Sequence, residues 1–224
     1  MCTEYTIPTS DAFEKHFRVQ LPLVYFAEQV FKRYAAPMLR LSDDPPSNVL
    51  AESAEFGLLP FFCKMRAYPF ETMSARSETV AVTAAYRTPW HRRQLCLVPM
   101  QTFIESNYEC GEPQAWHIWR RDGQPFAAAG IFDRWTSPQG GYVTSFSLLT
   151  REAQRHRLMQ RFLPLGKSKR SIVVVPPARY LDWLNASDES EVRGFITLFE
   201  ADEFDAGPAR PQLTSVQKFA LGTS

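Results

Sequence analysis

The pattern of apolar and polar positions in the middle of the chain predicts a series of antiparallel strands. Strands are expected at 102–108, 115–120, 126–135 and 142–149, in a meander-like run. The segments 121–124 and 138–141 contain glycine and polar residues and are predicted to be hairpin loops. Shorter apolar runs at 95–99 and 171–175 are typical of buried strands. A mostly antiparallel sheet follows from this pattern.

The flanking segments predict short helices around that sheet. Ser10 and Asp11 offer an N-cap for a helix to Phe17, and Thr150 offers one for a helix over 151–162. Further helices are expected at 180–184 and 192–199, and further strands at 2–7 and 49–56. Pro37 predicts an extended or turn conformation at 34–37 because proline disfavours helix at the preceding residue. We therefore predict an α+β fold in one domain, residues 1–224, with a barrel-like, mostly antiparallel sheet and peripheral helices.

The charge balance gives no sign of a polyelectrolyte partner. The 224 residues contain 25 Lys and Arg against 24 Asp and Glu, a net charge of +1. Any binding of nucleic acid must therefore depend on a local basic patch.

Cysteine and histidine are too sparse and too scattered to predict a metal site or a disulfide framework. The four cysteines lack zinc-site pairing, and no two of the four histidines stand in an H-x-x-x-H spacing. We expect no cofactor and no metal. The chain has no long apolar stretch and no signal-peptide pattern at its start, so we expect a cytoplasmic monomer that binds no membrane, associated with the nucleoid if the source is bacterial.

The first two residues, Met1 and Cys2, suggest a reactive terminus. Removal of Met1 would leave Cys2 with an α-amino group and a thiol on adjacent carbons. These groups titrate near pH ~8 and ~8.5, so part of each is nucleophilic at neutral pH. Such a 1,2-aminothiol can capture an aldehyde or an acyl group.

Several separated motifs resemble the SOS response-associated peptidase (SRAP) domain family in order and spacing. The resemblance rests on Cys2, Tyr34-Ala-Ala-Pro37, Phe56-Gly-Leu-Leu-Pro60 with Phe61-Phe62-Cys63-Lys64, Ser74-Ala-Arg-Ser-Glu-Thr79, Arg92-Arg93, Cys96-Leu-Val-Pro99 with Phe103-Ile-Glu105, Lys169-Arg170, Val173-Val-Val-Pro-Pro177 and Asp182-Trp-Leu184.

This resemblance implies binding to single-stranded DNA, or to a DNA junction, that carries an abasic site. Cys2 would condense with the ring-opened sugar aldehyde to a thiazolidine, and Glu105 would act as general acid and base in ring opening and in crosslink reversal. The positions implied to contact DNA are the cations Arg76, Arg92, Arg93, Lys169 and Arg170 and the aromatic residues Phe61 and Phe62.

The chain departs from the family pattern around the expected site. Ser168 occupies the position of the family's catalytic histidine, and a hydroxyl cannot replace imidazole as a base near pH 7. Ser74 stands where the family has asparagine, and Glu4 stands where it has arginine. These departures leave open whether peptidase or lyase chemistry survives.

Three functions are therefore compatible with the sequence. The first is an abasic-site sensor that forms a covalent adduct through Cys2. The second is a divergent SRAP paralogue that binds single-stranded DNA without covalent chemistry. The third is an amidohydrolase or autopeptidase whose nucleophile is the N-terminal cysteine.

Overall fold

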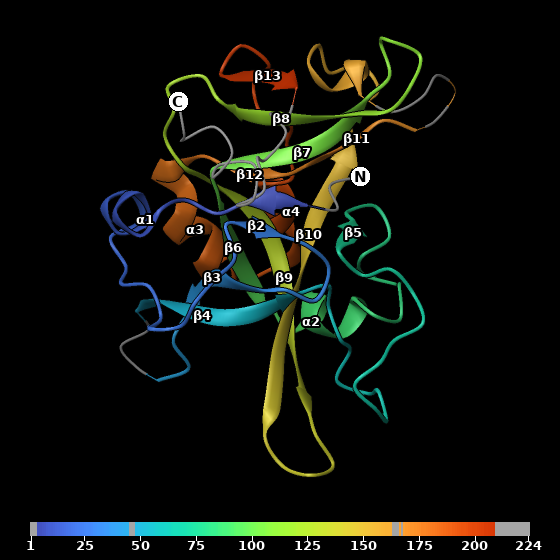
Figure 1. Cartoon of the computed structure of the whole chain (residues 1–224). Helices are drawn as coiled ribbons and strands as arrows, with labels where there is room; N and C mark the ends of the chain where they lie inside the picture. Colours follow the sequence, from blue (N-terminus) through green and yellow to red (C-terminus); the bar gives the residue numbers. More distant parts are fainter. Residues whose placement is uncertain (1–3, 45–47, 163–165, 167, 209–224) are drawn as a thin grey trace, which may run out of the picture.

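Strands dominate the computed structural model, which describes residues 4–44, 48–162, 166 and 168–208 (Figure 1). The fold is α+β with a mostly antiparallel, barrel-like sheet, as predicted. The strands are β1 Tyr5–Thr6, β2 Gln29–Val30, β3 Ala35–Leu41, β4 Val49–Phe56, β5 Ser74–Arg76, β6 Leu95–Met100, β7 Thr102–Asn107, β8 Gln114–Arg120, β9 Phe126–Thr136, β10 Tyr142–Glu152, β11 Arg170–Ile172, β12 Val174–Val175 and β13 Phe204–Pro208.

The larger sheet closes on itself. Its strands pair in the order β11-β10-β4-β3-β6-β9-β12, and β9 also pairs with β10, so β3, β4, β6, β9 and β10 form a closed circuit. Closure leaves these strands paired on both sides and removes the exposed edges that a flat sheet would have. Figure 1 shows β9 and β10 running the length of the molecule and extending beyond it as a hairpin.

The smaller sheet lies across one end of this barrel and has the order β13-β8-β7-β1-β2. Tyr5 of β1 pairs with Val30 of β2 on one side and with Phe103 of β7 on the other. Phe103 in turn pairs with Ile118 of β8. All four side chains are fully buried in one hydrophobic cluster, so this row fixes the small sheet to the barrel.

Two apolar clusters share the strands β6 and β9. Cys96 and Val98 face the cluster beneath the small sheet, whereas Leu95 and Leu97 face a second cluster that the helices cover. Burial on both faces explains why these strands are continuous apolar runs rather than alternating ones. Trp183 anchors the helical side, because its indole N–H donates to the Cys96 carbonyl at 2.9 Å.

The helices are short and peripheral. They are α1 Ser10–Phe17, α2 Arg87–His91, α3 Tyr180–Asn185 and α4 Glu189–Gly194, with 3₁₀ turns η1 Met159–Arg161 and η2 Pro177–Arg179. None of the helices in the described part of the chain is long and apolar enough to span a membrane.

Two helix predictions were wrong. No α-helix covers 151–162, because β10 continues to Glu152 and pairs there with β11, after which only η1 is helical. The helix expected at 192–199 is α4, which begins earlier and ends at Gly194. Its N-cap is Asp188, whose carboxylate accepts the Glu191 N–H at 2.9 Å.

The packing between β6, β9 and β10 predicts a sharp steric limit at Gly130. A Cβ at this residue would lie 2.8 Å from Cys96 Sγ and 2.9 Å from the Ser147 carbonyl oxygen. We expect Gly130→Ala to lower the free energy of unfolding by about 1–3 kcal/mol through overpacking, as measured by denaturant titration.

Gly194 provides the matched control, since nothing lies within 4 Å of a Cβ built there. Gly194→Ala should leave stability unchanged or raise it by about 0.5–1 kcal/mol, because alanine loses less entropy on folding. Equal stability of the two variants would contradict the strand packing described above.

Candidate functional site

Glu105 is a buried carboxyl group on the inner face of the small sheet. It belongs to β7 and is 4% exposed. Because side chains alternate along a strand, Glu105 faces the same side as the buried Phe103 and Asn107. Its paired residue on the neighbouring strand β8 is Trp116. Burial raises the pKa of Glu105 above its usual range, so the carboxyl retains its proton to a higher pH than a solvated glutamate would.

The beginning of the described chain lies directly beside Glu105. β1 is antiparallel to β7, and the Ile104 N–H donates to the Glu4 carbonyl at 3.1 Å. The side chain of Glu4 is held by Gln29, whose amide donates to the carboxylate at 2.8 Å. Cys2 lies outside the described residues, two positions before Glu4.

A second chain segment reaches β7 on the far side of Glu105. Phe162, fully buried at the end of η1, forms a bridge with Asn107, whose amide donates to the Arg161 carbonyl at 3.3 Å. The rings of Phe162 and Trp116 make an edge contact at 6.2 Å. The Arg161 guanidinium lies 5.0 Å from the centroid of Trp116 and pairs with Glu109. Glu105 therefore stands between the start of β1 and a wall of aromatic rings.

Lys169 and Ser168, consecutive in sequence, lie in different environments. Ser168, the residue at the histidine position of the resemblance, is exposed. Lys169 is 6% exposed, and its ammonium group donates to the Phe162 carbonyl at 2.5 Å. Burial lowers the pKa of this ammonium group. The inward-facing side chain of this segment is thus a lysine.

The remaining cations expected to contact DNA fall into two groups. Arg170 is buried and pairs with Glu78 at 2.6 Å, and Arg93 is turned inward so that its guanidinium donates to the Trp90 carbonyl at 2.7 Å. Arg76 and Arg92 are exposed. Of these four arginines, only the last two present their side chains on an open surface, and the DNA contacts of all of them stay predictions.

Phe61 and Phe62 lie on the surface, 43% and 47% exposed. They form an edge contact at 5.6 Å, and the series of ring contacts continues through Tyr68 to Phe70. The Arg92 guanidinium lies 5.5 Å from the centroid of Phe61. We call residues 58–70 the aromatic loop. Exposed rings beside a cation are a surface on which nucleobases can stack.

The aromatic loop is held by side chains of the long hairpin β9–β10. The Ser145 hydroxyl accepts the Leu59 N–H at 2.8 Å, and the buried Asp133 carboxylate accepts the Phe61 N–H at 2.9 Å. The Trp135 indole N–H donates to the Cys63 carbonyl at 2.6 Å. Burial raises the pKa of Asp133, opposed by these backbone donors. These three attachments fix the loop's backbone while leaving its rings exposed.

Ser74 begins β5 and pairs with Leu148 of β10. Its carbonyl accepts the Tyr86 hydroxyl at 3.2 Å. Two histidines have backbone contacts: His91 contacts the Ala81 carbonyl, and His156 contacts the Phe199 carbonyl and the Met159 N–H. Within the described ranges, no three His, Cys, Asp or Glu side chains gather closely enough to hold a metal ion.

The sequence profile of the SOS response associated peptidase (SRAP) family matches residues 1–216. The chain belongs to the SRAP family. Its relatives include the abasic site processing proteins YoqW and YoaM of Bacillus subtilis (strain 168), which are 22% and 23% identical to it. Each alignment covers 75% of this chain, together with 73% of YoqW and 72% of YoaM.

Solved structures share the fold of this chain. A protein from Bordetella bronchiseptica superposes with a TM-score of 0.86 at 26% identity, over 93% of this chain and 100% of the other. A protein from Bacteroides thetaiotaomicron has the same fold, with a TM-score of 0.78 at 20% identity, over 95% of this chain and 94% of the other.

Sequence reasoning missed the aromatic wall and the inward direction of Lys169. The burial of Glu105 was not predicted either, because the neighbouring Ile104 is buried as well and the strand shows no clean alternation. Nothing local indicated that Phe162 would bridge to Asn107, because the two residues are distant in sequence.

The raised pKa of Glu105 predicts a specific dependence of stability on pH. The folded chain holds the Glu105 proton more tightly than the unfolded chain, so this stabilising contribution is complete below the unfolded pKa of ~4.3 and is lost as pH rises through the folded pKa. Glutamine stays neutral throughout. We therefore expect Glu105→Gln to gain stability relative to the natural chain as pH rises from 4 to 8, as measured by denaturant midpoints.

The exposed Glu112, in the turn between β7 and β8, provides the control. Glu112→Gln should change the midpoint little at any of these pH values. A stability difference for Glu105→Gln that shrinks toward pH 8 would show that the carboxylate is favoured at this site.

Proposed function

We propose that this protein processes abasic sites, binding single-stranded DNA that carries the lesion and forming a thiazolidine crosslink through Cys2 after removal of Met1. Membership of the SRAP family and the names of its relatives support the abasic lesion as the target. The observation that carries the proposal is the pairing of β1 with β7, which brings the start of the described chain to Glu105.

Chain geometry limits how far Cys2 can be from this carboxyl group. Cys2 precedes Glu4 by two residues, and each residue spans at most ~3.6 Å, so its Cα lies within about 7 Å of that of Glu4. The Glu4 carbonyl is hydrogen-bonded to Ile104, the residue before Glu105. This short reach supports the proposal that the amine and thiol of a trimmed Cys2 act close to Glu105.

The chemistry that follows begins with a proton donor. Glu105, whose pKa burial raises, gives its proton to the ring oxygen while the anomeric hydroxyl releases its proton to water, and the sugar opens to the aldehyde. The Cys2 amine adds to that aldehyde, water leaves to give an imine, and the thiol adds to the imine carbon to close the thiazolidine. Overall, one aldehyde and one aminothiol yield one thiazolidine and one water.

The aromatic loop would hold the single strand near the reacting sugar. Stacking on Phe61 and Phe62 would be tolerant of sequence because every base has a π face. Arg76 and Arg92, the exposed cations, would contact phosphates. Binding of this kind weakens as salt rises, because phosphate contacts release counterions.

The first test of the proposal is the dependence of the crosslink on Cys2. Incubation with single-stranded DNA carrying an abasic site should give a denaturation-resistant band, and Cys2→Ala should abolish it. Mass spectrometry of the natural chain should show that Met1 is absent, because a retained Met1 would block the amine.

Two other outcomes of this crosslinking test would contradict the proposal. Salt-sensitive binding without a covalent band would assign the chain to the non-covalent binding module instead. A band of undiminished intensity in Cys2→Ala would refute the role of the thiazolidine.

The aromatic loop gives a second test of this function. Phe61→Ala and Phe62→Ala should each weaken binding to undamaged single-stranded DNA by about 5- to 150-fold, corresponding to the loss of one stacked base, roughly 1–3 kcal/mol. Fluorescence anisotropy at fixed salt measures the change.

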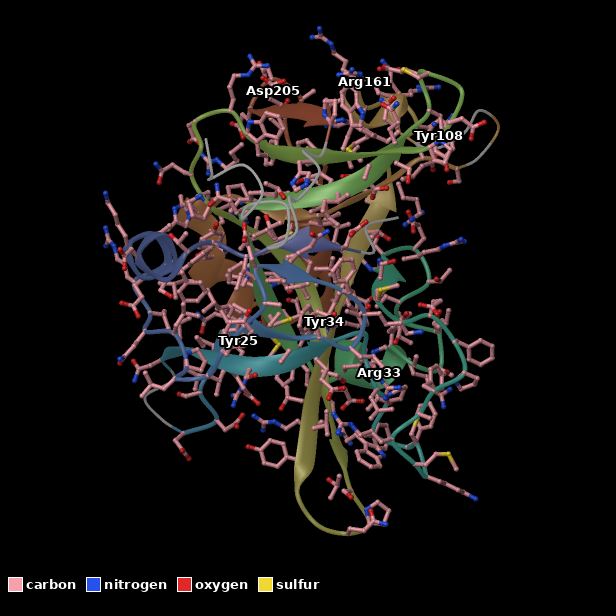
Figure 2. All side chains as sticks on the ribbon, viewed as in Figure 1. Tyr25, Arg33, Tyr34, Tyr108, Arg161 and Asp205 are labelled. Carbon is pink, nitrogen blue, oxygen red and sulfur yellow. The ribbon has the colours of Figure 1, made fainter. Side chains whose placement is uncertain are left out.

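Tyr25→Ala is the matched control, since Tyr25 is a highly exposed aromatic residue that Figure 2 shows on the side away from the aromatic loop. It should bind DNA as the natural chain does. Equal losses in all three variants would mean that DNA does not use this loop specifically.

A further inference from the structure

Lys169 is held in a fixed direction by the backbone around it. Its carbonyl accepts the Ala153 N–H at 2.8 Å, and its own N–H donates to the Gln154 side chain at 3.2 Å. Both contacts come from the segment that directly follows β10. These two contacts fix the backbone of Lys169, and its buried side chain follows a course into the protein.

That course ends beside the strand that bears Glu105. The Lys169 ammonium donates to the carbonyl of Phe162, and Phe162 bridges to Asn107, two residues along β7 from Glu105. The Phe162 ring also contacts Trp116, which pairs with Glu105 across β8. Paired residues in an antiparallel bridge lie ~4.5–5.5 Å apart, so these contacts place a buried cation and a buried carboxyl at one aromatic wall.

The proposed reaction needs a second proton donor at this place. Glu105 gives up its proton when the sugar ring opens, and the carbinolamine formed next must lose its hydroxyl as water, which again requires an acid. Ser168 is exposed and cannot serve. An ammonium group has three N–H donors, so Lys169 can serve the Phe162 carbonyl and an acceptor in the site at the same time.

We propose that Lys169 is the second proton-transferring residue of the Glu105 site, an inference that rests on the proposed crosslinking function. Its ammonium protonates the carbinolamine hydroxyl, water leaves, and a protonated imine and a neutral lysine remain. The Cys2 thiol then adds its sulfur to the imine carbon and returns its proton to the lysine. The residue ends as it began, and no oxidant or further reactant is needed.

The environment of Lys169 suits this exchange. Burial lowers the pKa of its ammonium group, which brings it toward the working pH and makes the proton easier to give and to take back. An arginine at the same position would keep the charge and the contact with Phe162 but would not release a proton near neutral pH.

The experiment compares Lys169→Gln and Lys169→Arg with the natural chain on two substrates. One is abasic single-stranded DNA, and the other is an oligonucleotide bearing an open-chain aldehyde, which needs no ring opening. We expect both variants to form the covalent band about 10²-fold more slowly on both substrates. In the natural chain the rate should fall as pH rises and the Lys169 ammonium group loses its proton. Both variants should lack this fall. Glu105→Gln should slow the reaction on abasic DNA far more than on the open aldehyde.

Arg40→Gln is the control, because it also removes a buried cation that donates to a carbonyl, that of Leu41 at 2.7 Å, but within the network of Glu52 and Asp43. It should affect thermal stability without altering the pH profile of crosslinking. If Lys169→Gln does not fold, the crosslinking rate and pH profile of Lys169→Arg alone test the inference.

The outcomes separate this inference from the function on which it rests. If the natural chain forms no band on either substrate, the proposed function fails. If it does so and Lys169→Arg reacts at the natural rate with an unchanged pH profile, the lysine is only a structural cation and the inference is wrong.

Discussion

The antiparallel pairing of β1 with β7 is the constraint on which the candidate site depends. Only two residues of β1 form this ladder, yet Tyr5 is packed between Val30 and Phe103 in a row of fully buried side chains. Removing such a row from water stabilises it by roughly 1.5–3 kcal/mol for each large side chain. A segment at the very start of a chain is ordinarily among the least ordered parts of a protein. Here the apolar row opposes that tendency and holds Glu4 beside Ile104.

The same burial that secures the sheet raises the pKa of Glu105. A carboxylate deprived of water is costly, and the protein responds by raising the pKa of this group. The role that we propose for Glu105 therefore opposes the stability of the fold. Its neighbours Trp116 and Phe162 exclude water from the same region, which strengthens any interaction with charge that develops during a reaction.

Much of the fold followed from the sequence, and the reasons for success and failure differ by element. The strands β7 to β10 were predictable because alternation and hairpin loops are local signals. The end of β10 was misread as helix because pairing with β11 is a contact between segments separated in sequence. For the site, the family resemblance singled out Glu105, but its burial became known only from the structure. The family motifs drew attention to Arg170 and Lys169, but the sequence could not show that both are buried, since their partners Glu78 and Phe162 are brought to them only by the fold.

β10 shows why these non-local contacts matter for the chemistry. Ser145 holds the aromatic loop at one point of this strand, Leu148 pairs with Ser74 further along, and Glu152 pairs with Arg170 at its end. A single strand in fixed register thus sets the spacing between the aromatic loop, β5 and the segment of Lys169 (Figure 1). A shift of that register by one residue would turn every side chain of the strand to the opposite face. Alignment with the family pattern identifies Ser168 as the residue that replaces the family histidine. The pairing of β10 with β11 decides which residue of this segment faces inward. The residue that it directs toward Phe162 is Lys169.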